Sequence, residues 1–323
     1  MNLEFREFIL EATQAKGISA GQKIQDLWSG YGTIKRYGLK GSALKSVIVK
    51  HIALPEAKDH PRGWNTNLSH KRKLRSYEVE KTWYKHWSSL CGEEERIPKC
   101  LAIKSSKQES WLVLEDLNAV GFERRKSSLS VNQMSVCLEW LANFHALFLG
   151  KKADNLWKVG TYWHLKTRPD ELQVLDDLEL KNAATVIDQK LNNARYQTIV
   201  HGDAKLANFC FSPDIARVAA VDFQYVGGGC GMKDIAYFIG SCLDENQCQQ
   251  NEKRLLDTYF NYLSKSVHLK NKDIDIDELI LEWKSLYALA WTDFHRFIKG
   301  WSPGHWKINS YSEQLARKVL EAL

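Results

Sequence analysis

The stretch that decides the fold is IVHGDAKLANFCF at residues 199–211, followed by RVAAVDFQ at 217–224. Its short apolar runs predict strands, and polar residues stand directly after them. Asp203 follows the first strand, Asn208 comes five positions later, and Asp222 ends the next apolar run. Phosphoryl transfer needs one carboxylate for the proton of the attacking hydroxyl, and an amide oxygen with a second carboxylate to hold Mg²⁺ against the phosphates. The pattern therefore predicts a site for phosphoryl transfer.

Each of these residues has a role in this interpretation. Asp203 would accept or orient the proton of an attacking hydroxyl. Asn208 and Asp222 would bind Mg²⁺, a hard cation that prefers oxygen ligands. Taken alone, Asp203 also fits an Asp that caps a turn after a strand, and the spacing of the three residues together favours catalysis. His201 would orient the loop through hydrogen bonds.

The same motifs support a family resemblance. HGDAKLAN with VDFQ resembles the HGDxxxxN and D-[FW]-[QED] motifs of aminoglycoside phosphotransferases and choline kinases, which are small-molecule kinases with a protein-kinase-like fold. The combination of DFQ, SYEVE and a Trp-rich C-terminal segment is most similar to the ecdysteroid-kinase-like branch. The resemblance covers about residues 25 to 300. It implies ATP as phosphoryl donor, Mg²⁺ as cofactor and a hydroxyl of a small organic molecule as acceptor.

The resemblance also assigns residues near the N-terminus. Lys50 ends the β-branched run VIVK and would hold the α and β phosphates, although a solvated Lys at a strand end is the alternative. Glu80 is the candidate partner of Lys50, and Glu78 competes because only the phase of the helix separates them. Gly30 and Gly32 would let a turn approach the phosphates, or would form a plain hairpin turn.

Two further segments fit the same template. Glu115, Asp116 and Leu117 resemble the family's hinge and would offer backbone groups to an adenine edge. Asp234 would cap a helix, support the catalytic loop, or do both. The three glycines at 227–229 predict a flexible or tightly turned segment. No protein-kinase APE motif follows them, which argues against a protein substrate.

Periodicity predicts an α+β chain with a strand-rich N-terminal part and a helix-rich remainder, and the resemblance implies a two-lobed, protein-kinase-like fold. The N-lobe, residues 1–117, would contain a helix at 3–16, a hairpin formed by 26–39 and 43–54, a long loop at 55–73, a helix at 74–90, and strands near 100–104 and 110–115. The C-lobe, residues 118–323, would contain short strands at 198–203, 209–211 and 218–223, and helices at 131–149, 171–191, 233–243, 251–266, 276–298 and 312–322.

Composition limits the partners. Lys plus Arg number 45 and Asp plus Glu 39, which leaves a net charge of +6 dispersed along the chain. That excess permits an anionic ligand but does not indicate nucleic-acid binding. No run is apolar and long enough for a membrane span, and the acidic N-terminus does not resemble a secretion signal. Seven cysteines without a CxxC pair predict reduced thiols and a cytoplasmic protein.

Several alternatives stay open at this stage. The segment WTDFHRFIKGWSPGHWKINSY at 291–311 is either a buried aromatic helix or an aromatic wall with Asp293 beside the acceptor. In the second case the acceptor is a bulky, partly apolar molecule held beside Trp291, Trp301 and Trp306. Choline- or ethanolamine-type kinase activity is the main rival function. A catalytically silent binding protein with a kinase fold is the rival from another class.

Overall fold

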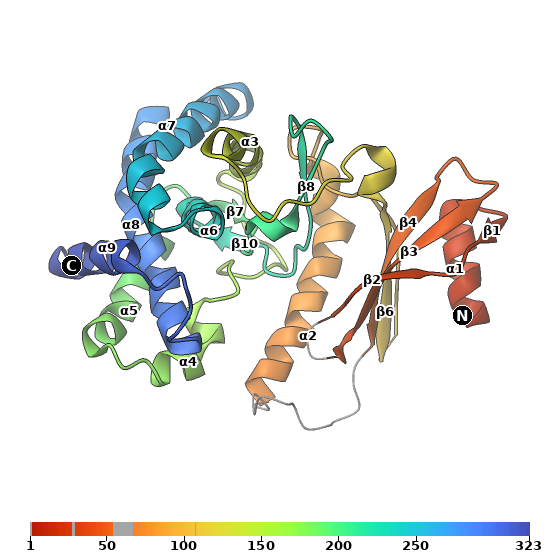
Figure 1. Ribbon diagram of the computed structural model, residues 1–323, viewed down its shortest axis with the longest axis horizontal. Helices are drawn as coiled ribbons and strands as arrows, with labels where there is room; N and C mark the ends of the chain where they lie inside the picture. The colour runs from red at the N-terminus through yellow and green to blue at the C-terminus, as the bar shows by residue number, and fades with distance from the viewer. Residues whose placement is uncertain (1, 28–29, 54–66, 107) are drawn as a thin grey trace. The chain divides into compact units, whose positions relative to one another are not determined.

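The computed structural model describes residues 2–27, 30–53, 67–106 and 108–323. These residues form two compact units (Figure 1). The N-terminal unit comprises Met1–Leu90, Ile97–Arg124 and Cys210–Val221, and the C-terminal unit comprises Cys91–Arg96, Arg125–Phe209 and Asp222–Leu323. The first is built on an antiparallel sheet and the second is mainly helical, which confirms the predicted α+β class. The boundary between residues 117 and 118 stays a prediction.

The N-terminal unit has a six-stranded sheet in its described part. The strands are β1 (Gly17–Ile18), β2 (Gln22–Asp26), β3 (Gly32–Lys40), β4 (Ser46–Ala53), β5 (Cys100–Ser105) and β6 (Glu109–Glu115). Their order is β1-β3-β4-β6-β5, and β2 also pairs with β3. The expected hairpin is formed by β3 and β4, with Ile34 opposite Lys50. Gly30 lies between β2 and β3 and Gly32 is the first residue of β3, so the strand predicted from residue 26 begins at residue 32 instead.

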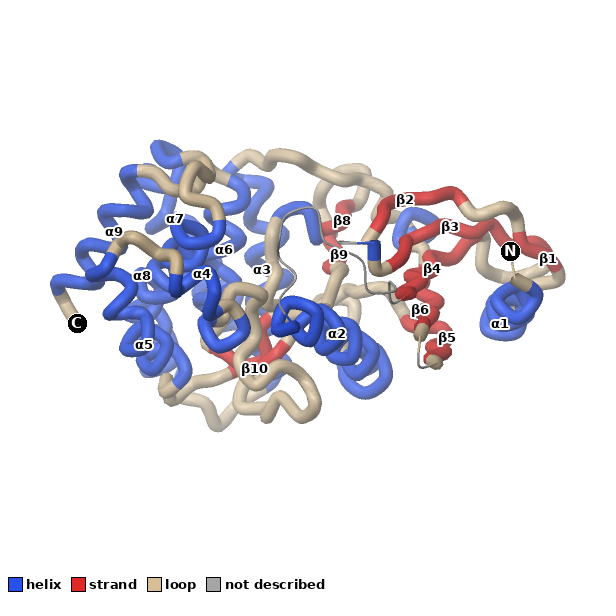
Figure 2. The backbone as a smooth tube through the Cα atoms, turned by 90° about the horizontal axis from the view of Figure 1, so that it is seen from below, coloured by secondary structure: helices blue, strands red, loops and turns tan. Residues whose placement is uncertain are grey.

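The two faces of this sheet have different partners. Successive residues of a strand point to opposite faces. Val47 and Val49 of β4 therefore share one face, and they pack in an apolar cluster with Phe5 and Ile9 of helix α1 (Leu3–Thr13). Lys50 points to the other face, on the side of helix α2 (Asn67–Thr82). Figures 1 and 2 both show the sheet between α1 and α2.

Helix α2 begins earlier than the sequence predicted. The loop expected over 55–73 is wrong for 67–73, where the basic run lies inside the helix, and 55–66 fall outside the described residues. The chain has no Pro or Gly from 68 to 91, and Lys and Arg are good helix formers. The helix continues into a π-helical turn, Trp83–Trp87, and a 3-10 turn, Ser88–Leu90.

The segment after β6 is held by Asp116. This residue caps a 3-10 turn (Leu117–Val120) by accepting a bond from the Asn118 N–H at 3.1 Å. Its carboxylate also accepts from Arg36 Nε of β3 at 2.7 Å and from Ser46 Oγ of β4 at 2.6 Å. Strands β8 (Phe209–Phe211) and β9 (Val218–Ala220) form a small sheet. An apolar cluster near this turn contains Leu117, Phe122, Cys210 and Ala219.

The C-terminal unit is mainly helical. Its α-helices are α3 (Val131–Phe148), α4 (Pro169–Gln173), α5 (Leu178–Asn192), α6 (Met232–Cys242), α7 (Glu245–Lys270), α8 (Ile276–Trp301) and α9 (Ser310–Glu321). Helix α3 packs on α7, and α8 packs on α5, α6 and α9. In the described part of the chain, none of the helices combines the length and the apolar character that crossing a membrane requires.

Three elements of this unit differ from the expectation. The helix predicted over 171–191 is divided into α4 and α5, because Asp177 starts a new helix by accepting from the Leu180 N–H. Helix α7 begins earlier than predicted, at a capping box formed by Asp244 and Gln247. The three glycines form strand β10 (Gly227–Gly229), which pairs antiparallel with β7 (Thr198–Val200). A Cβ at Gly227 would lie 2.2 Å from the Trp157 carbonyl oxygen, so only glycine fits there.

Gly30, which precedes β3, and Gly32, which begins it, provide a matched test of this packing. Gly32 has a φ of +128°, and a Cβ there would lie 2.0 Å from the His51 carbonyl oxygen of β4. Gly30 has a φ of +74°, and a Cβ there would meet no atom within 4 Å. We therefore expect Gly32→Ala to lower the free energy of unfolding by about 2 kcal/mol or more, and Gly30→Ala by about 1 kcal/mol. Urea unfolding measures both, and equal effects would contradict the register of β3 on β4.

Candidate active site

A buried ion pair lies in the N-terminal unit. The Lys50 ammonium on β4 lies 2.8 Å from Oε1 and 2.7 Å from Oε2 of Glu80 on α2. The two residues are 3% and 2% exposed, and the Tyr77 ring centroid lies 5.8 Å from the ammonium. Glu78 points elsewhere: it pairs with Lys81 at 2.7 Å, and its side chain is 60% exposed. The phase of α2 thus brings Glu80, and not Glu78, to Lys50.

This pair is costly to bury. Taking both charges out of water carries a desolvation penalty that their attraction repays only with good geometry. An apolar pair of similar volume would often be as stable. A strongly desolvated ion pair is therefore a candidate for function, in line with the role that the sequence predicts for Lys50.

Two backbone hydrogen bonds join described residues around the predicted phosphate turn. The N–H of Leu27 donates to the Gly32 carbonyl at 2.8 Å, and the N–H of Gly30 donates to the Leu27 carbonyl at 3.2 Å. Gly30 is exposed, and the space where its side chain would stand is open. Gly32 is tight against β4 instead. Of the two glycines, Gly30 is the one that leaves room for another group to approach the backbone.

The predicted hinge uses part of its backbone within the chain. The Glu115 N–H donates to the Lys99 carbonyl at 2.8 Å, and the Leu117 carbonyl accepts from the Phe122 N–H at 2.9 Å. The Asp116 carbonyl accepts from the Ala119 N–H. An adenine edge would have to use other backbone groups of this turn.

The catalytic loop follows β7 in the C-terminal unit. Oδ2 of Asp203 accepts from Lys205 Nζ at 3.0 Å and from Asn208 Nδ2 at 3.0 Å. Asn208 Nδ2 also donates to the Asp203 carbonyl at 2.7 Å. Oδ1 of Asp203 is buried and has no partner of hydrogen-bond geometry among the described residues. The Tyr237 hydroxyl, whose pKa is raised by burial, is near enough for the Asp203 carboxylate to raise that pKa further. The loop therefore holds one oxygen of this carboxylate and leaves the other available to accept a proton.

Charges around Asp203 are closely coupled. Burial raises the pKa of Asp203 above its ordinary value, the Lys205 ammonium opposes that shift, and the Asp222 carboxylate adds to it. Burial lowers the pKa of Lys205, but the carboxylates of Asp203 and Asp222 outweigh it and leave this pKa raised. Both effects require the two carboxylates and the ammonium to lie near one another. The structure thus brings Asp203, Asn208 and Asp222 together in one unit.

The oxygen donors present fit a magnesium ion. Both bonds of the Asn208 amide to Asp203 use Nδ2, which leaves its Oδ1 as a ligand. Asp222 has a φ of +71°, and Gln224 Nε2 donates to its Oδ1 at 2.5 Å. Within the described ranges, no group of three or more His, Cys, Asp or Glu residues is arranged for a metal. One amide and one carboxylate suit Mg²⁺, which usually retains water and completes its shell with phosphate oxygens.

Asp234 supports the catalytic loop. Its carboxylate accepts from the N–H groups of His201 at 2.6 Å and Gly202 at 2.9 Å, and lies 3.2 Å from His145 Nε2. The N-cap of α6 is Gly231, so of the two predicted roles the structure favours support of the loop. Gly202 has a φ of +78°, and a Cβ there would lie 2.1 Å from the Tyr225 carbonyl oxygen. The His201 ring accepts from the Asp203 N–H at 3.2 Å, as expected of an orienting residue.

Lys205 is a site residue that sequence reasoning missed. Its ammonium contacts the carboxylate predicted to act as base, and its side chain is 39% exposed. The signal was available in the motif, because Lys205 stands two positions after Asp203 in HGDAKLAN. The motif was interpreted only through its Asp and its Asn, and no role was assigned to the Lys between them.

The C-terminal aromatic segment is mainly packed. Trp291 is 7% exposed and packs edge-on against Tyr311, whereas Trp306 is 57% exposed. Asp293 is 2% exposed and is bound by Trp163 Nε1 at 3.0 Å and by Arg296 Nη2 at 2.8 Å. The cavity next to Trp291 and Trp306 has a volume of about 10 Å³, which is room for about one water. These observations favour packing over a wall for a bulky acceptor.

Solved structures with similar folds are small-molecule kinases. An amicoumacin kinase solved with AMP-PNP and Ca²⁺ has a TM-score of 0.57, with 12% identity over 99% of this chain and 92% of that chain. The choline kinase of Cryptosporidium parvum Iowa II has a TM-score of 0.54, with 9% identity over 99% and 95%. The ethanolamine kinase of Plasmodium vivax has a TM-score of 0.52, with 11% identity over 95% and 85%. These likenesses confirm the kinase-like fold.

The sequence matches the Ecdysteroid kinase-like family over residues 45–162 and 161–271. The chain therefore belongs to this family, as its motifs predicted. A search of curated proteins found no match.

Separate substitutions of Glu80 and Glu78 test the buried Lys50–Glu80 ion pair. Glu80→Gln leaves the Lys50 ammonium buried without its charge partner, so we expect the free energy of unfolding to fall by about 3 kcal/mol. Glu78→Gln removes the charge of an exposed ion pair and should change the free energy of unfolding by about 0.5 kcal/mol or less. Urea unfolding of the two variants compares them. A larger fall in the free energy of unfolding for Glu78→Gln than for Glu80→Gln would show that Glu78, and not Glu80, faces β4.

Proposed function

We propose that this chain is an ATP- and Mg²⁺-dependent phosphotransferase that moves the γ-phosphoryl group to a hydroxyl of a small organic molecule. The observation that carries the proposal is the state of the Asp203 carboxylate. One oxygen is fixed by Lys205 and Asn208, and the other is buried with no partner among the described residues. An acceptor hydroxyl placed at the second oxygen would complete the hydrogen bonding of this group.

The reaction then has a defined course. The acceptor oxygen attacks the γ-phosphorus, the bond from that phosphorus to the oxygen of ADP breaks, and the hydroxyl proton passes to Asp203. The raised pKa of Asp203 favours its role as a proton acceptor, because the ideal pKa of a base is closer to neutral than that of a free carboxylate. Asp234 contributes by fixing the backbone on which Asp203 stands.

Lysines would balance the phosphate charge. Lys205, next to Asp203, would stabilise the charge on the transferred group, and Lys50, fixed by Glu80, would hold the remaining phosphates. Asn208 and Asp222 would hold Mg²⁺, which neutralises charge on the phosphates when bound. Gln224 would keep the Asp222 carboxylate in place for this purpose. Family membership supports this assignment, and the likeness to kinases supports the fold on which it rests.

Removal of the base tests the proposal. Asp203→Asn retains the shape of the side chain but cannot accept the proton, so we expect turnover of ATP and acceptor to fall by roughly 10²-fold or more. Asp214→Asn is the matched control, because Asp214 lies in the turn between β8 and β9 and bonds Ser212. Its turnover should stay within about twofold of the parent protein. Full turnover in the Asp203 variant would exclude it as the base.

The metal requirement gives a second test. Because Asn208 and Asp222 act on the nucleotide through Mg²⁺, we expect ATP affinity to be at least about tenfold higher with Mg²⁺ than with excess chelator. Calorimetry measures this difference. In Asp222→Ala, ATP affinity should be the same with Mg²⁺ and with chelator. A spectrum that reports on folding should be the same for this variant and the parent protein. Equal ATP affinity of the parent protein with and without Mg²⁺ would refute the metal assignment.

A further inference from the structure

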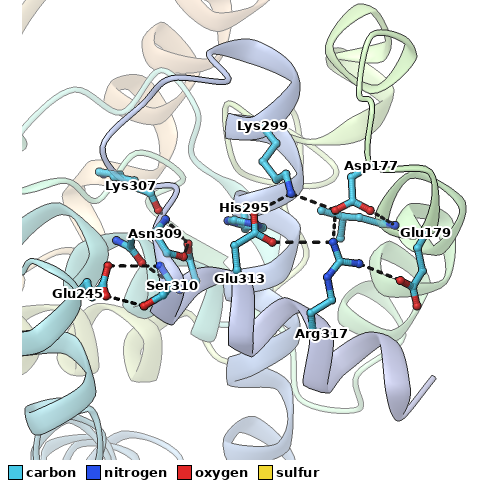
Figure 3. A network of polar contacts seen from close by, with 12 residues as sticks. Asp177, Glu179, Glu245, His295, Lys299, Lys307, Asn309, Ser310, Glu313 and Arg317 are labelled. Atoms are coloured by element: carbon cyan, nitrogen blue, oxygen red, sulfur yellow. Dashed lines mark hydrogen bonds and ion pairs between the residues drawn. The ribbon is translucent and has the colours of Figure 1, made fainter.

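A half-buried lysine lies on an aromatic surface of the C-terminal unit. The Lys307 ammonium is 4.8 Å from the ring centroid of Tyr237 on α6 and 5.3 Å from that of Phe294 on α8. Among the described residues its ammonium has neither an ion-pair nor a hydrogen-bond partner. Lys307 enters the network of Figure 3 only through its carbonyl, which accepts from Ser312 Oγ, and its side chain extends away from Glu313. A cation is thus held by ring faces alone.

The same rings lead to the catalytic loop. Tyr237 packs on Tyr162 with ring centroids 5.6 Å apart, and the Tyr162 N–H donates to the Gly202 carbonyl at 3.2 Å. Burial raises the pKa of both tyrosines, and the Asp203 carboxylate raises them further. Burial lowers the pKa of Lys307 to about 8, with the Cys242 thiol and the Asp203 carboxylate opposing it, so the amine remains mainly protonated at pH 7. The Lys307 ammonium therefore lies close enough to the Asp203 carboxylate for the two charges to interact.

The carboxylates of Asp293 on α8 and Glu313 on α9 already have partners within the chain. Asp293, the group that the sequence offered to a cationic acceptor, is bound by Arg296 and Trp163. Glu313 accepts from Lys299 at 2.7 Å (Figure 3). An acceptor with an ammonium group would be repelled by Lys307 and would find these two carboxylates neutralised. An acceptor with an anionic group would instead provide the missing partner of a partly desolvated cation, which is a charge-assisted contact.

We infer that the acceptor alcohol carries an anionic group, a carboxylate or a phosphate, and that Lys307 binds this group. The inference rests on the proposed phosphotransferase function and specifies its substrate class. It makes Lys307 a specificity-determining residue. It also disfavours choline, ethanolamine and other cationic acceptors, although kinases for these compounds share the fold.

The test is ADP release by the full chain with Mg-ATP and three sets of alcohols. One set holds hydroxycarboxylates and phosphorylated alcohols as separate arms, the second holds their neutral methyl esters and diols, and the third holds amino alcohols. We expect the best turnover in an anionic arm, and the arm shows which anion is used. Lys307→Gln should raise the KM for that acceptor about 10- to 100-fold, with a much smaller change in the KM for ATP. Lys307→Arg should restore most of the loss.

Lys318→Gln on α9 is the matched control, because Lys318 is exposed and the same charge is lost elsewhere. Best turnover with neutral or cationic alcohols would overturn the inference. So would an unchanged acceptor KM in Lys307→Gln, or slow Mg-dependent ATP hydrolysis that no anionic alcohol increases. A protein that neither binds Mg-ATP nor releases ADP under any condition would overturn the proposed function itself, which separates the two failures.

Discussion

The position of Asp203 depends on two backbone hydrogen bonds. The N–H groups of His201 and Gly202 converge on the carboxylate of Asp234, which is fully buried in α6. The loop can follow this path only because residue 202 is a glycine with a positive φ, packed against the Tyr225 carbonyl. Charge-assisted bonds of this kind are among the stronger ones in proteins. They fix the backbone directly before Asp203, on which the position of the proposed base depends.

The second constraint is the burial of charge. Lys50 and Glu80 are almost completely removed from water, and Asp203 keeps an unpartnered buried oxygen. Neither feature favours stability, since a desolvated charge costs free energy unless it is fully compensated. Both features are reasonable if a nucleotide contacts the ion pair and an alcohol bonds to the Asp203 oxygen. The proposed function thus accounts for polar groups that packing alone does not explain.

Local motifs were predictable from the sequence, and contacts distant in sequence were less so. The spacing of Asp203, Asn208 and Asp222 indicated the loop, and a β-branched run ending in Lys50 indicated β4. The three glycines were expected to turn, yet they form β10, because their strand conformation depends on β7 and on Trp157. Likewise, Asp293 was open to an acceptor role until its bonds to Arg296 and Trp163 were known. Periodicity reports which face is apolar, but not which polar groups meet.

In the proposed reaction Asp203 directs a phosphoryl group to an alcohol. The fate of the label from γ-³²P-ATP shows this when the protein is incubated with Mg²⁺ and a mixture of hydroxylated small molecules. We expect label in an organic phosphate that resists mild acid, formed by the parent protein and not by Asp203→Asn. Label found only in inorganic phosphate or on the protein itself would rule this reaction out.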